Sequence, residues 1–433
     1  MENKRKLLEE ISRRSTSKDE AIINLVLKHK LYNYLDNNIV SADVSDKIVA
    51  SHNVMAIEKL LKSSNILSDW AQKTIFNEYP FDVVKLLLQR NQPLCDEIEE
   101  ALLIEADDDL INCYIEHHSF KEAAEKTLLK DRLIGILYFY IQSHKLSPAG
   151  ELEVIKHPNL LCRYLTYNSL SIEAFNEFII NYAYPEAINL LLQKKMKADE
   201  EYVFVKHAQV NDIGKYIKHY KFTNIDDIVE ILLKRGFFDE VVSIIKATDR
   251  CFNARTEAEI LNAPTLVVMA YIEKHSLKES QQLQIVKRGN TDEIIKLAQH
   301  NFVQPPSQMA ILERENSQEI IALLENHQTC NDFQKALIER GIPSEIFALC
   351  STNTLFSNVQ NALIGRGVDV EITTYINRRE LDNQAFLRLL TEKTNLVSCY
   401  IQRYLLNDYQ LKKFVELASD SDIELYLNLY YPD

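Results

Sequence analysis

The sequence predicts an all-α protein, an α-solenoid: a superhelical array of about sixteen antiparallel helix pairs with short helices and short links. Three observations support this fold class. Aliphatic residues recur with a period of about 26 residues, small residues mark one turn within each period, and Gly (8) and Pro (10) are too few for a fold rich in strand turns. Repeats of this length indicate a stack of small units with no single central core.

The repeat is defined by one aliphatic or small residue near the end of each apolar cluster, here called the anchor. Spacings between anchors run from 24 to 28 residues, and the residue four positions earlier is a branched aliphatic in all sixteen copies. The residue after the anchor is always polar. The sixteen anchors are Leu35, Leu61, Leu88, Ile115, Ile141, Leu165, Leu192, Ile217, Ile245, Ile272, Ala298, Leu324, Cys350, Ile376, Ile401 and Leu427.

Each period contains two helices. Residues four apart share a helix face, and a second apolar cluster lies about twelve residues before each anchor. Between the two clusters, nine residues before the anchor, Gly or Ala stands in nine copies, where a first helix must end and the chain must turn. Each unit is therefore helix A of about nine residues, a turn, helix B of about nine residues, and a link.

Helix starts are predicted from capping-box spacing, in which an N-cap side chain and a Glu or Gln three residues later bond reciprocally to the backbone. Four first helices carry this pattern: Asp69 with Gln72, Asp96 with Glu99, Asn331 with Gln334, and Ser357 with Gln360.

The domain prediction is a single α-solenoid over 1–433, with an N-terminal capping helix over 1–14 and about sixteen hairpin repeats over 15–433. The capping helix is the most basic part of the chain, through Lys4–Lys6, Arg13 and Arg14. Helices of about nine residues are shorter than those that are stable alone in water. Neighbouring repeats must therefore stack to bury their apolar faces.

The consensus of Asn331–Leu349 and Ser357–Ile376, N/S-x-x-Q-x-A-L-I-x-R-G-x-x-x-E-I-x-x-L/Y-I, resembles the short helical-hairpin repeats of uncharacterised bacterial proteins, whose units have the form A-L-I-x-R-G-x-x-E-I-x-x-Y-I. The resemblance covers nearly the whole chain. It implies the α-solenoid architecture and no particular activity. The period is too short for tetratricopeptide or ankyrin repeats, which have about 34 and 33 residues.

Charge and hydropathy exclude several classes of partner. A net charge of −14 repels phosphate backbones, and there is no Lys/Arg run of five or more, so the sequence disfavours nucleic acid. The sequence has no apolar run of 18 residues and no signal-type segment at the N-terminus. It therefore predicts a soluble chain without a membrane partner. The expected location is cytoplasmic, with export without a cleaved signal peptide left open. The seven cysteines lack a C-x-x-C pair and are predicted to be reduced core residues.

The sequence predicts no enzyme: no catalytic residue, no cofactor and no metal site. Phosphate-binding Gly loops, nucleophile elbows and H-E-x-x-H sequences do not occur. Histidine recurs two or three residues after the anchor. There it would either cap the end of helix B or form a metal ladder; the repeat spacing of about 8–10 Å favours capping, because zinc ligands lie near 2 Å from one ion. The six histidines are His118, His144, His219, His275, His300 and His327.

The predicted function is a protein-binding scaffold or adaptor that uses an extended surface of stacked hairpins. The candidate binding residues are Tyr138, Phe139, Arg163 and Tyr167, because exposed aromatic and Arg side chains are enriched at protein interfaces. Local repacking around the 24-residue repeat is the competing interpretation. The protein partner is not identified, and tyrosines near the C-terminus suggest self-association through terminal repeats. The alternatives are a nucleic-acid-binding repeat array and an α-helical toroid-type hydrolase.

Overall fold

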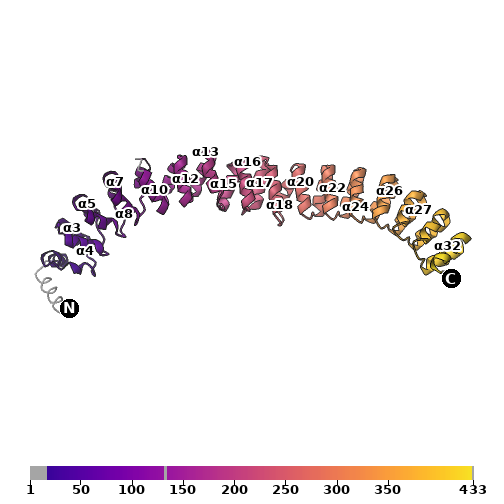
Figure 1. Cartoon of the computed structure of the whole chain (residues 1–433), viewed down its shortest axis with the longest axis horizontal. Helices are drawn as coiled ribbons and strands as arrows, with labels where there is room; N and C mark the ends of the chain where they lie inside the picture. The colour runs from indigo at the N-terminus through magenta and orange to yellow at the C-terminus, as the bar shows by residue number, and fades with distance from the viewer. Residues whose placement is uncertain (1–16, 131–133, 432–433) are drawn as a thin grey trace, which may run out of the picture. The chain divides into compact units, whose positions relative to one another are not determined.

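The computed structural model describes residues 17–130 and 134–431. The capping helix predicted over 1–14 lies outside the described residues. Within them every regular element is helical, and α2 to α32 are 31 short α-helices. The chain divides into two compact units, Met1–Tyr216 (unit 1) and Ile217–Asp433 (unit 2), each a row of successive helical hairpins (Figure 1). The predicted α-solenoid fold is confirmed, while the continuity of one array over 1–433 stays a prediction.

Unit 1 contains the first eight repeats. Its helices are α2 (Lys18–Ile23), η1 (Asn24–Lys28), η2 (Tyr32–Tyr34), α3 (Ala42–Ala50), α4 (Val54–Lys62), α5 (Asp69–Glu78), α6 (Phe81–Leu88), α7 (Asp96–Glu105), α8 (Asp108–Ile115), α9 (Glu122–Lys130), α10 (Ile134–Ser143), α11 (Pro148–Val154), α12 (Pro158–Tyr167), α13 (Ile172–Asn181), α14 (Pro185–Leu191), α15 (Ala198–His207) and α16 (Val210–His219), within which the unit ends.

Unit 2 contains the other eight. Its helices are α17 (Ile225–Arg235), α18 (Phe238–Ala247), α19 (Ala254–Asn262), α20 (Thr265–Lys274), α21 (Glu279–Arg288), α22 (Thr291–His300), α23 (Pro305–Glu313), α24 (Ser317–Asn326), α25 (Asn331–Arg340), α26 (Pro343–Thr352), α27 (Ser357–Arg366), α28 (Asp369–Ile376), α29 (Asn383–Glu392), η3 (Thr394–Leu396), α30 (Val397–Ile401), α31 (Asp408–Leu417) and α32 (Asp420–Tyr430).

Helices of the same kind stack on one another along each unit. Helix A of one repeat contacts helix A of the next, as in α21, α23 and α25, and helix B contacts helix B, as in α20, α22 and α24. The anchors lie in the seam between repeats and are buried in fourteen of sixteen copies; Ile217 is half-buried and Leu427 is 50% exposed. The core is thus a continuous apolar seam built from the recurrent positions.

The first repeat departs from the prediction of two full helices. After α2 the chain continues as the π-helix η1, and the expected helix B is reduced to the single 3-10 turn η2. Lys30, two residues before this turn, has a left-handed backbone (φ 54°). Only a few residues then remain, several of them Asn, which is a weak helix former, so a full helix does not propagate.

The four predicted capping boxes are wrong, because each helix begins one residue earlier than the pattern indicated. Asp69, Asp96, Asn331 and Ser357 are the first helical residues, and the N-caps are the residues before them. The Glu or Gln three positions on is buried and bonds to the next repeat instead. Gln334, for example, accepts a hydrogen bond from Phe356 N at 3.3 Å through Oε1.

A Tyr–carboxylate pair ties neighbouring repeats of unit 1 together. Tyr140 Oη donates to Glu125 Oε1 at 2.9 Å within one repeat, and Glu125 Oε2 accepts from Ser147 N of the next repeat at 2.8 Å. Four repeats of unit 2 have Gln at the same repeat position: Gln282, Gln308, Gln334 and Gln360. Gln360 Oε1 accepts from Asp382 N of the next repeat at 2.8 Å, and its Nε2 donates to Leu355 O at 3.0 Å. In both cases the adjoining hairpin supplies a partner for the buried polar side chain.

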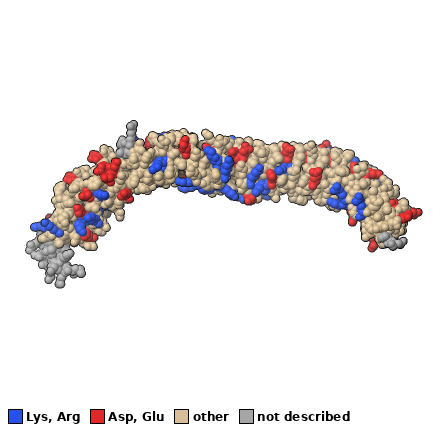
Figure 2. Space-filling view, viewed as in Figure 1, with Lys and Arg blue, Asp and Glu red and all other residues tan. Residues whose placement is uncertain are grey.

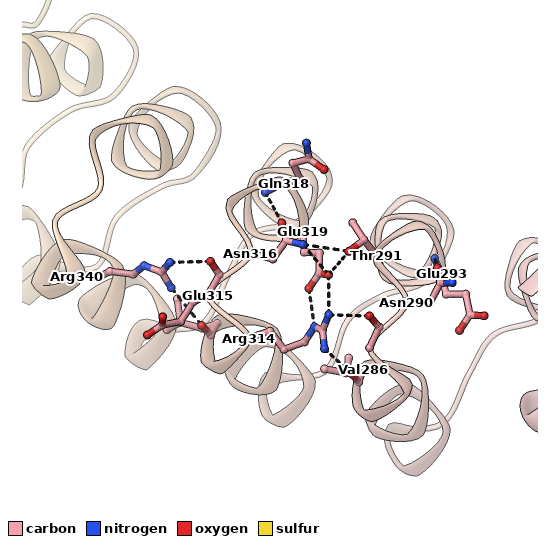
Figure 3. A network of polar contacts seen from close by, with 12 residues as sticks. Val286, Asn290, Thr291, Glu293, Arg314, Glu315, Asn316, Gln318, Glu319 and Arg340 are labelled. Atoms are coloured by element: carbon pink, nitrogen blue, oxygen red, sulfur yellow. Dashed lines mark hydrogen bonds and ion pairs between the residues drawn. The ribbon is translucent and has the colours of Figure 1, made fainter.

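A second polar link explains the R-G-x-x-x-E part of the consensus. Arg314 Nε donates to Glu319 Oε2 at 2.8 Å, and Arg314 Nη2 donates at 2.9 Å to Gly289 O at the end of helix A in the preceding repeat (Figure 3). The Glu319 side chain is fully buried. The same Arg–Glu pair, five residues apart, recurs as Arg288–Glu293, Arg340–Glu345 and Arg366–Glu371.

Two physical reasons favour glycine at the position after the Arg of this motif. Gly341 ends α25 with a left-handed backbone (φ 78°), and a Cβ added there would lie 2.6 Å from Arg366 Nη1. Nη2 of the same guanidinium donates to Gly341 O. A side chain at this position would be strained and would displace the guanidinium of the next repeat.

We expect Gly341→Ala to lower the free energy of unfolding by about 1–2 kcal/mol from backbone strain, with a further loss from displacement of Arg366. Gly135→Ala is the matched control, because nothing lies within 4 Å of its added Cβ and α10 has helical backbone there. It should be neutral or stabilising by up to about 1 kcal/mol. Urea unfolding of both variants checks this; equal stabilities would contradict it.

Candidate protein-binding surface

Three of the four predicted binding residues meet on two neighbouring helix-B segments. Tyr138 lies on α10, Arg163 and Tyr167 lie one helical turn apart on α12, and α10 contacts α12. The Arg163 guanidinium carbon lies 5.5 Å from the centre of the Tyr138 ring and 5.4 Å from that of Tyr167. Both distances are typical of cation–π contacts. These three residues are here called the Tyr–Arg–Tyr stack.

The stack is solvent-accessible. Tyr167 is 46% exposed, Arg163 is exposed and Tyr138 is half-buried. None of the described residues forms an ion pair with Arg163, so its charge is balanced by no described carboxylate. A guanidinium within cation–π distance of two rings has lost part of its rotational freedom, although the Arg163 residue remains exposed.

Phe139 stands apart from the stack. It is 37% exposed on α10, and among the described residues no ring contact joins it to Tyr138, Arg163 or Tyr167. Adjacent helical positions point in directions about 100° apart, which accounts for the separation. The structure therefore brings together three of the four candidates, with Phe139 on an adjoining part of the same helix.

Buried tyrosines on the same two helices fix the orientation of the stack. Tyr140 on α10 and Tyr164 on α12 are fully buried, and Tyr164 Oη donates to Glu151 Oε1 at 2.7 Å. Burial raises the pKa of Tyr140 and Tyr164 far above its ordinary value, so both remain hydrogen-bond donors. Because these rings are locked inward, Tyr138, two residues before Tyr140, lies on the far side of α10, and Arg163, next to Tyr164, points about 100° away from it.

Of the six histidines after the anchors, His327 has a printed contact with a helix-B carbonyl, the contact that the capping interpretation predicts, although that carbonyl belongs to the preceding repeat. His327 Nε2 lies 2.5 Å from Ala298 O, near the end of helix B in the preceding repeat. Asn301 and Asn353 take the same place in their repeats, with Nδ2 donating to Ile272 O and Leu324 O. His118, His144 and His275 stack on the buried tyrosines Tyr114, Tyr140 and Tyr271. Among residues 17–130 and 134–431 no group of three His, Cys, Asp or Glu could hold a metal ion.

Carboxylates gather at one open hollow of 330 Å³ in unit 1. Asp69, Asp96 and Glu97 line it, and Lys121 Nζ and Lys73 Nζ form ion pairs with Asp96 and Glu97 at 2.7 and 3.0 Å. The hydrogen bond from Lys73 lowers the pKa of the Glu97 carboxyl. A general acid needs a raised pKa, so this hollow has the electrostatics of paired surface charges and lacks those of an acid–base pair.

No cysteine with a shifted pKa has an activated thiol, because in each of them burial raises the pKa. All seven are free, and burial raises the pKa of Cys350 to about 12. A thiol in that state is a packing residue. The prediction of core cysteines is wrong for Cys251, which is exposed on the link between α18 and α19.

The sequence reasoning missed the polar links between repeats. Their signal was present as the 26-residue recurrence of Arg288, Arg314, Arg340 and Arg366, each followed five residues later by Glu. Sequence alone does not distinguish these residues from surface charges, whereas stacking buries the Glu of each pair.

Comparisons with known proteins give little beyond the architecture. No protein-family model matches the chain, and no curated protein matches it. It is similar to a solved structure described as a "Circular tandem repeat protein with novel repeat topology and enhanced subunit contact surfaces", with 11% sequence identity, 92% of this chain and 93% of that chain covered, and a TM-score of 0.12. Overlap at this level carries no argument. Among the described residues, no helix has both the length and the apolar character needed to cross a bilayer.

Proposed function

We propose that the protein is a scaffold or adaptor that binds another protein through the exposed side of its helix-B row, with the Tyr–Arg–Tyr stack as the main contact. The observation that carries this proposal is the exposed guanidinium of Arg163 between the rings of Tyr138 and Tyr167. Arg and Tyr are the residue types that contribute most often to interface hot spots. Stacked repeats present such residues along an extended surface.

The charge distribution on the face drawn in Figure 2 fits a protein partner better than a nucleic acid. On the face shown in Figure 2, acidic and basic side chains are interspersed between large areas that carry neither. Nucleic-acid grooves instead gather Lys and Arg along the path of the backbone. Phe139, 37% exposed beside the stack, adds apolar area of the kind found at the centre of protein interfaces.

The test is quantitative recovery of partners by the immobilised chain and by Arg163→Ala. Hot-spot truncations cost about 2 kcal/mol or more, so at least one partner should be lost by about 30-fold in affinity. The partner recovered should then be titrated against both proteins by calorimetry.

Tyr202→Ala is the matched control. Tyr202 is 44% exposed on the helix-A segment α15, and Lys206 Nζ lies 5.9 Å from its ring centre, so it presents a similar aromatic–cation pair away from the stack. Unchanged recovery of every partner by Arg163→Ala, or equal losses with Tyr202→Ala, would contradict the proposal. Circular dichroism should show the same helix content for all three proteins.

A further inference from the structure

An open hollow of 740 Å³ lies between the links that follow α4 and α6, in the second and third repeats of unit 1. Arg90 and Lys62 line it, and none of the described residues in its lining is Asp or Glu. In a chain with 63 Asp and Glu residues and a net charge of −14, two cations without a carboxylate form an unusual lining. The volume lies in the range of about 300–1,000 Å³ that small-molecule sites occupy.

Arg90 brings a buried cation to this hollow. The residue is 8% exposed, and its Nη1 donates to Leu60 O at 2.8 Å and to Leu61 O at 2.7 Å near the end of α4. Nη2 donates to Asn65 O, and Nε is buried without an acceptor. These three acceptors leave two of the five guanidinium N–H groups unused.

The charge of Arg90 has no counter-ion among the described residues. No described carboxylate forms an ion pair with it, and burial lowers the pKa of its guanidinium, because the ionised form loses water. A buried charge without a partner of opposite sign costs stability. An anion in the hollow would remove this cost.

Capping of the preceding helix B does not require a charge. Asn168, Asn301 and Asn353 each donate to the corresponding carbonyl of the preceding repeat with a neutral amide. The carbonyl end of a helix carries about half of one negative charge, which offsets only part of the two positive charges at the hollow. The remaining positive charge is therefore available to a ligand.

Lys62 lies beside Arg90 in the lining. It directly follows Leu61, whose carbonyl accepts from Arg90, and its exposed side chain forms no ion pair with any described residue. Ser64 and Asn91, also exposed in the lining, form no side-chain hydrogen bond with any described residue. The hollow thus combines two cations with neutral polar groups that can still form hydrogen bonds.

We propose that this hollow binds a phosphate monoester of a small polar molecule, with the phosphate at Arg90 and Lys62 and the polar body toward Ser64 and Asn91. A phosphate monoester carries a charge of about −1.5 to −2 on one group at neutral pH, which matches two cations better than a single carboxylate does. Arginine binds phosphate through charge-assisted hydrogen bonds. This site lies on other repeats than the Tyr–Arg–Tyr stack and goes beyond the scaffold role.

Isothermal titration calorimetry of the full chain tests the proposal, with glucose 6-phosphate as the probe and glucose as the uncharged control ligand. We expect the phosphate ester to bind and glucose to give no signal. Arg90→Gln removes one charge and keeps an amide donor for the carbonyls of α4, and Lys62→Gln removes the other charge. Each substitution should raise the dissociation constant by about tenfold or more, because hydrogen bonds to charged groups are the strong ones.

Lys194→Gln is the matched control variant. Lys194 Nζ donates to Leu165 O at 3.3 Å, as Arg90 does to Leu61 O, but the hollow beside it measures 120 Å³ and includes Glu200 in its lining. Its affinity for glucose 6-phosphate should equal that of the wild type. Inorganic phosphate should bind the wild type more weakly than the ester, because it lacks the polar body.

Absence of binding to the wild type, equal binding of glucose, or unchanged affinity in either Arg90→Gln or Lys62→Gln would overturn the proposal. A loss of the same size in Lys194→Gln would also overturn it, because it would show a general effect of charge. Equal affinities for inorganic phosphate and the ester would refute the place given to the polar body. If circular dichroism shows that Arg90→Gln loses helix content, Lys62→Gln decides alone, since its side chain is exposed.

Discussion

Arg314→Ala is expected to lower the free energy of unfolding by about 3–5 kcal/mol, because it leaves Glu319 buried without its charge partner. The Glu319 carboxylate is fully buried, and Arg314 contacts both of its oxygens at 2.8 and 3.0 Å (Figure 3). The same substitution removes the donor to Gly289 O in the preceding repeat. The loss should therefore weaken the junction between two hairpins and should extend beyond one helix.

Hydrogen–deuterium exchange with urea unfolding measures this effect. Faster exchange is expected in both α21–α22 and α23–α24, since Arg314 bridges these repeats. Lys335→Ala is the control, because Lys335 pairs with Glu339 on the surface at 3.7 Å with both side chains more than half exposed. Exposed pairs contribute little, so its effect should stay below about 0.5 kcal/mol. Comparable losses in the two variants would show that the buried pair has no special role.

Glu125→Ala is expected to cost at least about 2 kcal/mol of unfolding free energy. It leaves the buried Tyr140 hydroxyl and the partly buried Ser147 N without their acceptor, and each unsatisfied buried donor costs about 1–3 kcal/mol. Glu125→Gln keeps an acceptor and adds a donor, and Gln360 beside Tyr375 already shows that Gln and Tyr fit together at this repeat position. The Gln variant should therefore be as stable as the wild type at neutral pH, or more so.

The difference in unfolding free energy between Glu125→Gln and the wild type should also depend on pH. Burial raises the pKa of Glu125 above its ordinary value, which is about 4.3, because the ionised form loses water. The folded carboxyl therefore holds its proton to higher pH than the unfolded one. This contribution to stability is complete below the unfolded pKa and is lost as pH rises through the folded pKa.

The advantage of Glu125→Gln over the wild type should thus grow from about pH 4.3 upward and level off above the folded pKa. Tyr140 stays protonated over this range, because burial raises its pKa as well. Urea unfolding at a series of pH values measures the difference. A wild type that gains stability relative to the Gln variant as pH rises would contradict the prediction.

Much of the fold could be predicted because stacking imposes a strict pattern on the sequence. A position that lies in the seam between hairpins must be apolar in every copy, and buried tyrosines such as Tyr114, Tyr271 and Tyr375 follow from the same rule. Helix boundaries were less certain. Asp96 and Asn331 were placed as caps, although the residue before each begins the turn, because a first-turn side chain and an N-cap side chain have the same composition.

The candidate site could be predicted only in part. Exposed aromatics beside an Arg were visible in the sequence, but the contact of Arg163 with Tyr138 depends on how α10 packs on α12, 25 residues away along the chain.

By itself the sequence determined the helical-hairpin repeat, its period and its apolar seam, since these follow from local helix periodicity and from the apolar cover that neighbours must provide. Tertiary structure decided which charged and polar residues cross from one hairpin to the next. In the sequence, Arg314 and Glu125 cannot be told apart from charged residues on the surface. Only the approach of a second hairpin removes water from the partner atoms and makes their hydrogen bonds decisive for stability.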